Sequence, residues 1–273
     1  MKKFKANISN LIKDKDHRKH WLYIVLAKPN IYLKNLVIRT ILMGLVLVFM
    51  YFIASNLDLK EQAIPTNMHG LIGVVIGLTL SFRASSAYDR WWEARKILAD
   101  IKASLVYVKI RLIDEPFSDK ANQSLSKINS LIFSFIKCDN KNKEQMKLQV
   151  YREIIKIQRE LSNISHLSNV DRKLSEIINS FSGLERIKDS PIPQSYAIHI
   201  KMSIFAYLLS LPFGIFFSMG LFSIPLVMLL YFIIAGIEII SSEIENPFEG
   251  SANDLPLDKL ETLNEKVLKS ILK

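Results

Sequence analysis

The stretch from Gly70 to Arg95, GLIGVVIGLTLSFRASSAYDRWWEAR, changes character in its middle. The 20 residues from Ala63 to Phe82 contain no Asp, Glu, Lys or Arg, and about 20 residues are what an α-helix needs to cross the hydrocarbon layer of a membrane. From Arg83 onward the sequence is polar and charged, but no Pro or Gly interrupts it until Pro116. The stretch therefore predicts one long helix with an apolar first half and a polar second half.

Two stripes of side chains run along the apolar half of this helix. Small residues recur every three or four positions, which lets another backbone approach one face closely. These residues are Gly70, Gly73, Gly77 and Ser81. A second stripe, Val74, Leu78 and Phe82, follows an adjacent face at four-residue spacing. It could be an ordinary packing face, or an apolar constriction where copies of the helix meet around an axis. Periodicity does not choose between the two.

Apolar residues gather in three blocks, which predicts an all-α membrane protein with four transmembrane helices and a helical cytosolic body. The last block, Met202 to Ile237, has 36 residues without a charge and suits a hairpin of two helices. We expect a single unit over residues 1–273. Its parts are a basic cytosolic segment (1–35), membrane helices 1 and 2 (36–82), a cytosolic helical region (83–201), membrane helices 3 and 4 (202–240) and a cytosolic C-terminal segment (241–273).

The net charge of +10 fits either nucleic-acid binding or a cytoplasmic surface beside anionic lipid. No nucleic-acid motif accompanies the charge, so nucleic acid is not an expected partner. Lys and Arg are in excess before the first span, which predicts a multi-pass protein of the plasma (inner) membrane with both termini in the cytoplasm. The single cysteine, Cys138, excludes a disulfide within the chain.

Motifs of catalysis are missing from the sequence. The five His residues are dispersed, and there is no P-loop, nucleophile elbow or metal-binding HExxH, so we expect no enzyme and no catalytic residue. The membrane blocks also lack the buried charges that are typical of a coupled transporter.

Two further stretches interrupt the helical pattern. The first is Ser190-Pro191-Ile192-Pro193, where the prolines impose an extended segment that could be a plain hinge. The second, Ser241 to Glu261, carries clustered carboxylates and amides directly after an apolar span. Such groups can bind a hard cation such as calcium, but they also cap helices and form salt bridges.

Three stretches together resemble the bestrophin family, in particular its bacterial branch. They are SFRASSAYDRWWEARKILADI (81–101), SPIPQSY (190–196) and IENPFEGSANDLPLD (244–258). The resemblance implies a bestrophin-like homopentamer with one central pore, which is an ion channel that conducts monovalent ions of the chloride or the sodium type. It implies an apolar neck at Val74, Leu78 and Phe82, and a cytosolic aperture at Ile192. Self-association, monovalent ions and the lipid bilayer are the expected partners.

The resemblance also implies positions for a calcium clasp. The matching residues are Glu243, Asn246, Ser251 and Asp254. Ser251 stands where animal members place an Asp, and Glu249-Gly250 replaces the usual order after the Phe. Loss of a carboxylate weakens a hard-cation site, so no cofactor is firmly expected and calcium is doubtful.

A different class of function would fit the same pattern. A membrane-anchored scaffold, whose cytosolic helices bind a protein partner without ion flux, would also need a basic start and amphipathic helices. Ion flux separates this scaffold from the channel.

Overall fold

The computed structural model describes residues 31–56, 66–138, 142–161, 168–251 and 253–271, and every regular element among them is helical. The prediction of an all-α protein is confirmed. Four helices are long and apolar enough to cross a membrane, in agreement with the four predicted spans. The basic start of the chain, residues 1–30, and the connection over 57–65 lie outside the described residues.

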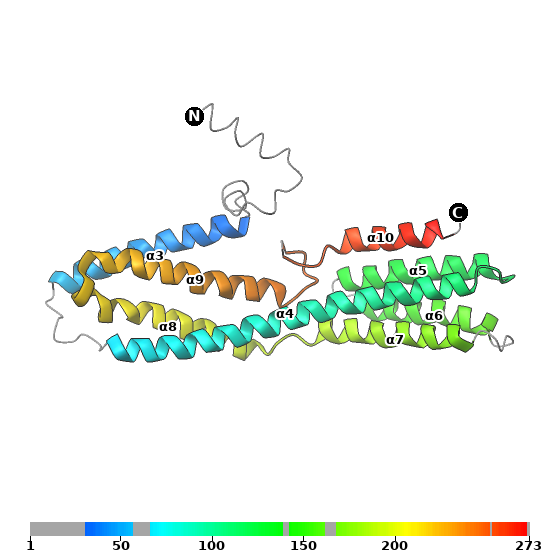
Figure 1. Ribbon diagram of the computed structural model, residues 1–273, viewed down its shortest axis with the longest axis horizontal. Coiled ribbons are helices and arrows are strands. Elements are labelled where there is room, and N and C mark those ends of the chain that lie inside the picture. The colour runs from blue at the N-terminus through cyan, green and yellow to red at the C-terminus, as the bar shows by residue number, and fades with distance from the viewer. Residues whose placement is uncertain (1–30, 57–65, 139–141, 162–167, 252, 272–273) are drawn as a thin grey trace, which may run out of the picture. The chain divides into compact units, whose positions relative to one another are not determined.

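The long helix is continuous across the change from apolar to polar sequence. Helix α4 runs from Thr66 to Arg111 and spans the junction between Phe82 and Arg83 without a break (Figure 1). The helix ends at Arg111 and a turn follows, so Pro116 lies outside the helix and does not interrupt it. The prediction of one rod with two chemical halves is therefore confirmed.

The chain divides into two compact units, and the first comprises residues 1–69 and 208–236. It contains α3 (Ile31–Asn56), the end of α8 (Gln194–Met219), the short helix η5 (Gly220–Phe222) and most of α9 (Ser223–Ile244). The rings of Tyr51 on α3 and Phe216 on α8 meet edge to face at 5.3 Å. Gly220 makes the turn of the predicted hairpin at a positive φ of 57°, which glycine adopts without steric cost.

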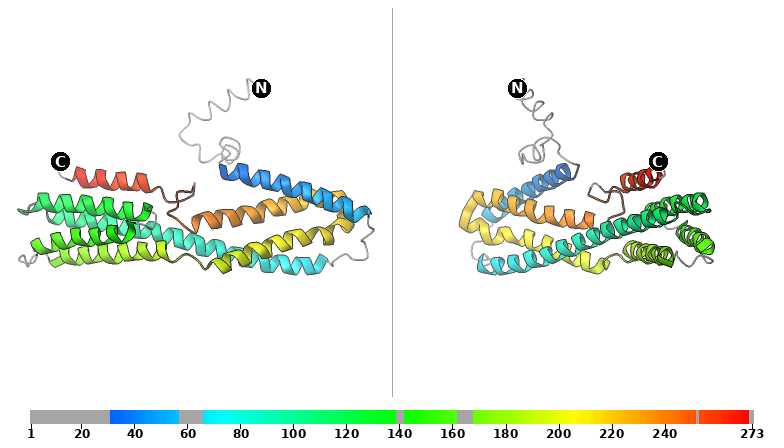
Figure 2. Two further views of the ribbon diagram at one scale, coloured as in Figure 1. Left: turned by 180° about the vertical axis from the view of Figure 1, so that it is seen from behind. Right: turned by 45° about the vertical axis from the view of Figure 1, so that its right-hand side comes forward.

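The second unit, residues 70–207 and 237–273, contains the helical body. Alongside the second half of α4 lie α5 (Ser118–Lys137), α6 (Lys143–Leu161) and α7 (Ser168–Asp189), and α10 (Leu257–Ser270) packs on α5 (Figures 1 and 2). The buried stripe of α4 is the one that its spacing of three and four predicts. It consists of Ala94, Leu98, Ile101, Leu105, Val108 and Leu112.

Lysine side chains fix helix ends of this body. Lys188 of α7 donates hydrogen bonds to the carbonyls of Phe135, Ile136 and Cys138 at 2.6 to 2.9 Å, where α5 ends. A cation at the C-terminal end of a helix satisfies carbonyls that have no partner within the helix and interacts favourably with the helix dipole. Lys137 of α5 in turn pairs with Asp258 and Glu261 of α10 at 2.5 and 2.7 Å. The ends of α5, α7 and α10 are thereby tied together.

Candidate functional site

The stripe of Val74, Leu78 and Phe82 lies on the face of α4 that the chain itself leaves uncovered. Their exposed fractions are 61%, 56% and 67%. The buried face of the same segment lies roughly half a turn away, since at about 100° per residue it is centred opposite the stripe. Its residues are Ile76, Leu80, Arg83 and Ala87, each no more than 9% exposed. Within one chain, the stripe is therefore not an ordinary packing face.

Within this chain, another side chain packs against only one of the three glycines in the small-residue stripe. A methyl group added to Gly73 would meet the hydroxyl oxygen of Tyr207 at 2.6 Å, so α8 approaches α4 closely there. At Gly70 and Gly77, an added methyl group would meet nothing within 4 Å. The atoms nearest to Gly73 all belong to the Tyr207 side chain, so the close approach of another backbone stays a prediction, and Gly70 and Gly77 present an open surface.

Directly after Phe82, the side chain of Arg83 is buried between three helices. It is 2% exposed, and its guanidinium donates to Glu245 Oε2 at 3.2 Å and to the Ala197 carbonyl at 3.4 Å. Glu238 Oε1 lies 3.7 Å from the same guanidinium and 3.5 Å from Lys201 Nζ. The prediction that the membrane blocks lack buried charge is wrong here, because Glu238 belongs to α9 and only 15% of its side chain is exposed.

The polar residues that follow Arg83 on α4 bond to two other segments, the end of α7 and the acidic loop. Arg90 donates to the Ser190 carbonyl at 2.8 Å and to the Ile187 carbonyl, at the end of α7. Trp91 Nε1 donates to the Asn253 carbonyl at 3.2 Å, and Glu93 accepts from Arg186 of α7 at 2.8 Å. The stretches 81–101, 190–196 and 244–258 therefore meet around α4, although they are far apart in the sequence.

Ile192 lies in the connection between α7 and α8, which has no regular structure over residues 190–193. Its side chain is partly exposed, and the prolines on both sides are exposed. Backbone hydrogen bonds hold the two ends: Ser190 donates to Arg186, and Tyr196 and Ala197 donate to Pro193. The interruption of the helices that the sequence predicts at SPIP is confirmed, whereas its extended conformation and the role of Ile192 stay predictions.

The acidic loop connects α9 with α10, and its side chains mainly bond to the loop itself. Glu243 accepts from the side-chain amide of Asn253 at 2.6 Å, and Asp254 Oδ2 accepts from the Ser251 amide at 2.7 Å. Burial raises the pKa of Asp254, although the backbone amides of Ser251, Gly250 and Glu249 oppose this by stabilising the charged form.

The donor set fits calcium poorly. Only Glu243 and Asp254 among the four clasp positions are carboxylates, and both already accept hydrogen bonds. Among the described residues, no group of three or more His, Cys, Asp or Glu side chains is arranged to hold a metal ion. The calcium clasp stays a prediction, and we derive no step through the metal. What the loop does in this structure is accept the hydrogen bond from Trp91.

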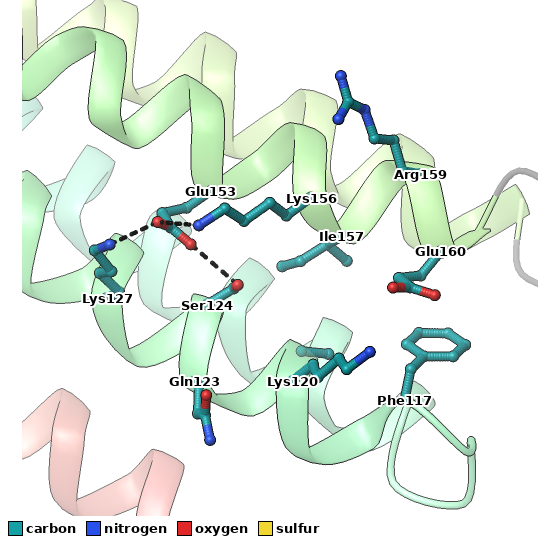
Figure 3. A pocket seen from close by; sticks show the side chains of 11 residues that line it. Phe117, Lys120, Gln123, Ser124, Lys127, Glu153, Lys156, Ile157, Arg159 and Glu160 are labelled. Carbon is teal, nitrogen blue, oxygen red and sulfur yellow. Dashed lines mark hydrogen bonds and ion pairs between the residues drawn. The ribbon is translucent and has the colours of Figure 1, made fainter.

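A pocket of about 480 Å³ lies between α5 and α6, with a buried carboxylate in its wall. Glu153 accepts from Ser124 at 3.1 Å and pairs with Lys127 and Lys156 at 2.8 and 2.9 Å (Figure 3). Burial raises the pKa of Glu153, but hydrogen bonds from the two lysines and Ser124 outweigh it, so that its pKa is lowered. These charged groups pair with one another, so they stabilise the packing of α5 on α6 rather than form a binding site.

Sequence reasoning missed the partners of the arginines, but one signal pointed to them. Glu238 is a single charge with apolar residues on both sides, in IIAGIEIIS, and an ionisable residue within a membrane block has a functional or pairing role by default. The partners of Arg83 and Arg90 lie about a hundred residues or more along the chain, where no local spacing could reveal them.

These features define an all-helical membrane protein with an uncovered apolar stripe beside a buried ionic cluster. The sequence profile of the bacterial/fungal bestrophin proteins matches residues 13–138 and 103–270 of the chain, so the chain belongs to this family. The resemblance found in the sequence is thereby confirmed.

Relatives and solved structures agree with this assignment. A voltage-dependent anion channel-forming protein of Synechocystis is 29% identical over 267 residues, covering 85% of this chain and 83% of that protein. The voltage-dependent anion channel-forming protein YneE of Escherichia coli K12 is 24% identical, with 89% and 88% covered. A bacterial bestrophin homologue from Klebsiella pneumoniae shares the fold at a TM-score of 0.74 and 19% identity, over 86% of this chain and 98% of that structure. The family is one of channels and not of enzymes, as the sequence predicted.

Proposed function

We propose that this chain assembles as a homopentameric channel through which monovalent ions pass passively along a central axis. The observation that carries this proposal is the exposure of Val74, Leu78 and Phe82 on the side of α4 opposite its packed face. Five copies of that face turned toward one axis would form three stacked apolar rings, which pass a hydrated ion only when they widen or stay wet. Ile192 would form a further apolar ring on the cytosolic side.

The surfaces beside the stripe suit a symmetric assembly. The open small residues Gly70 and Gly77 would let a neighbouring helix approach on one flank of the neck. On the other flank, Ile72 and Val75 are 45% and 57% exposed and would face a neighbour or lipid. A ring of identical subunits uses two such different flanks, because each subunit meets its two neighbours with different faces.

Anions are the ions that the names of the curated relatives favour, since these are described as anion channel-forming proteins. The neck itself carries no charge that sets the sign of the permeant ion. We place the channel in the inner membrane with both termini in the cytoplasm, because Lys34 and Arg39 lie in the first part of α3 and positive charge marks the cytoplasmic side.

Ion flux through purified protein in liposomes tests this function. We expect flux in sodium chloride that persists when sodium is replaced by an impermeant cation and stops when chloride is replaced by an impermeant anion. The opposite pattern would overturn the assignment to anions while keeping the channel. No flux with either ion would favour the scaffold.

Substitution of the neck tests which residues form it. Leu78→Ala shortens the side chain at the middle ring and so widens the opening. We therefore expect a several-fold higher flux with assembly intact. Ile72→Ala is the matched control, because Ile72 is also exposed on α4 but lies on a different face. Equal flux of the two variants would contradict the neck.

A further inference from the structure

Two arginines on one face of α4 reach the two ends of the segment that contains Ile192. Arg90 Nη1 donates to the Ser190 carbonyl at 2.8 Å, and Arg83 Nη1 donates to the Ala197 carbonyl at 3.4 Å. The arginines are seven residues apart, which is about two helical turns and returns to nearly the same face. We name this pair of contacts the arginine bracket.

The segment between these two contacts has few backbone hydrogen bonds of its own, so its position depends on side chains that bond to it. Pro191 and Pro193 have no backbone N–H, so no helical or sheet ladder can run through residues 190–193. The carbonyls that accept from Arg90, those of Ile187 and Ser190, lie at the end of α7, where a carbonyl has no partner within the helix. Arg90 therefore supplies hydrogen bonds at a point where secondary structure cannot, whereas Arg83 contacts the segment at Ala197, in the first turn of α8.

The same helix carries the neck. Phe82 is directly followed by Arg83, and the neck stripe and Arg83 lie on opposite faces of α4. A rotation or shift of α4 that moves Leu78 and Phe82 would therefore also move both guanidiniums, and with them the carbonyls on either side of Ile192.

We propose that Arg83 and Arg90 are positioning residues that couple the aperture at Ile192 to the neck. The proposal rests on the proposed function, because it takes the neck and the aperture as the two restrictions of one pathway. Arg90 is the better residue to test. Its hydrogen-bond acceptors are backbone carbonyls, whereas replacement of Arg83 would remove the cation that bonds to Glu245 and would leave Glu238 with Lys201 alone.

The first experiment measures the aperture without reference to ion flux. Ile192→Cys is introduced together with Cys138→Ser, and the rate at which a charged thiol reagent modifies Cys at 192 is measured in the assembled protein. We expect Arg90→Gln to change this rate by roughly tenfold, the equivalent of one lost hydrogen bond to a charged group. Arg90→Lys keeps the charge but not the fork of donors, so it should restore the rate only partly.

Arg186→Gln is the matched control. The side chain of Arg186 joins the same two helices through Glu93 at 2.8 Å, and 69% of it is exposed. Arg186 contacts Ser190 only through its backbone carbonyl, which the substitution keeps. A general loosening of α4 from α7 would change the rate equally in Arg186→Gln and Arg90→Gln, and would overturn the proposal. An unchanged rate in assembled Arg90→Gln would overturn it too. If Arg90→Gln fails to assemble, Arg90→Lys is compared with Arg186→Gln in the same way.

The second experiment measures coupling. Flux is compared among the parent, Leu78→Ala, Arg90→Gln and the double variant. Coupled restrictions predict that the double variant departs by more than about threefold from the product of the single effects, and independent restrictions predict that product. If Leu78→Ala leaves the flux unchanged, the proposed neck fails. The modification rates of Cys at 192 still report on the bracket in that case, so the two failures are distinguishable.

Discussion

The two halves of α4 differ in what the chain provides for them. Before Arg83, large apolar side chains such as Leu71, Leu78 and Phe82 are more than half exposed. After it, Arg90 and Glu93 bond to the end of α7, and Trp91 bonds to the loop that follows α9. A single helix thus combines an apolar surface that needs a neighbour, lipid or a pore with polar side chains that already bond within the chain.

The difference shows how one rod can serve both assembly and conduction. Hydrogen bonds and ion pairs are directional, so the second half fixes the rotation of α4 about its own axis. Apolar contacts are not directional, so the first half could not fix its own rotation in a bilayer, where lipid is as apolar as leucine. In the proposed channel, the polar half would therefore determine which side chains of the apolar half face the axis.

Loss of Arg83 should break this arrangement most strongly. Arg83→Met leaves Glu245 and Glu238 without their buried cation, and removal of one partner of a buried ion pair costs about 3–5 kcal/mol. We expect a large fall in the temperature at which the detergent-solubilised assembly unfolds. Arg186→Met removes an exposed pair of the same helix and should cost less than about 1 kcal/mol. Similar losses in the two variants would show that the ionic cluster does not fix α4.

Gly73 and Gly77 form a matched pair for the apolar half. Gly73→Ala places a methyl group 2.6 Å from the Tyr207 hydroxyl, so α8 must shift, at a cost of about 1–3 kcal/mol. Gly77→Ala meets nothing within the chain and should stay within about 1 kcal/mol of the parent, through the better helix propensity of alanine.

Rescue identifies the cause of the first effect. Tyr207→Phe removes the oxygen that the methyl group would meet, so it should recover most of the stability lost in Gly73→Ala. Thermal unfolding of the single and double variants checks this. If Gly77→Ala is as harmful as Gly73→Ala, a neighbouring subunit packs on the face that one chain leaves open.

The sequence was sufficient for the course of α4 and its packed stripe. Continuity across Arg83 follows from the lack of Pro and Gly between Gly77 and Pro116, and the stripe from Ala94 to Leu112 follows from spacing alone. The turns also lie where residue types predict them: SPIP separates α7 from α8, and Gly220 makes the hairpin turn. Each of these features depends on residues that are neighbours in the sequence.

The ionic cluster could not be predicted in this way. The pattern around Arg83 is compatible with a guanidinium that faces solvent, and only the fold brings Glu245, 162 positions away, into contact with it. Ser190 and Asn253 contribute backbone carbonyls, which every residue has, so no residue type reveals them as partners. The neck could be placed by resemblance, but its opposition to the buried face required the structure.

A smaller effect is expected at Glu153 of α6, which does not belong to the ionic cluster around Arg83. Its pKa is lowered, because the hydrogen bonds from Lys127, Lys156 and Ser124 outweigh burial. The unfolded state therefore binds the proton more readily, so Glu153 contributes stability above its unfolded pKa and loses it as the pH falls through its folded pKa. Glu153→Gln should cost about 1–2 kcal/mol near neutral pH and nearly nothing in acid. Unfolding temperature measured against pH checks this, and a constant difference between the two proteins would contradict it.

The smallest effect is expected on removal of calcium. An apolar neck needs no metal to be closed, and the acidic loop already uses Glu243 and Asp254 as hydrogen-bond acceptors from Asn253 and Ser251. Burial also raises the pKa of Asp254, which disfavours the ionised carboxylate that a hard cation requires. Flux with millimolar calcium and with a chelator should therefore be the same.

Trp91→Phe provides the contrast, because it removes the hydrogen bond from Trp91 to the loop and should lower stability by about 1 kcal/mol with or without calcium. A flux that follows calcium in the parent and is insensitive to it in Asp254→Asn would show instead that the loop binds the metal with the residues it has.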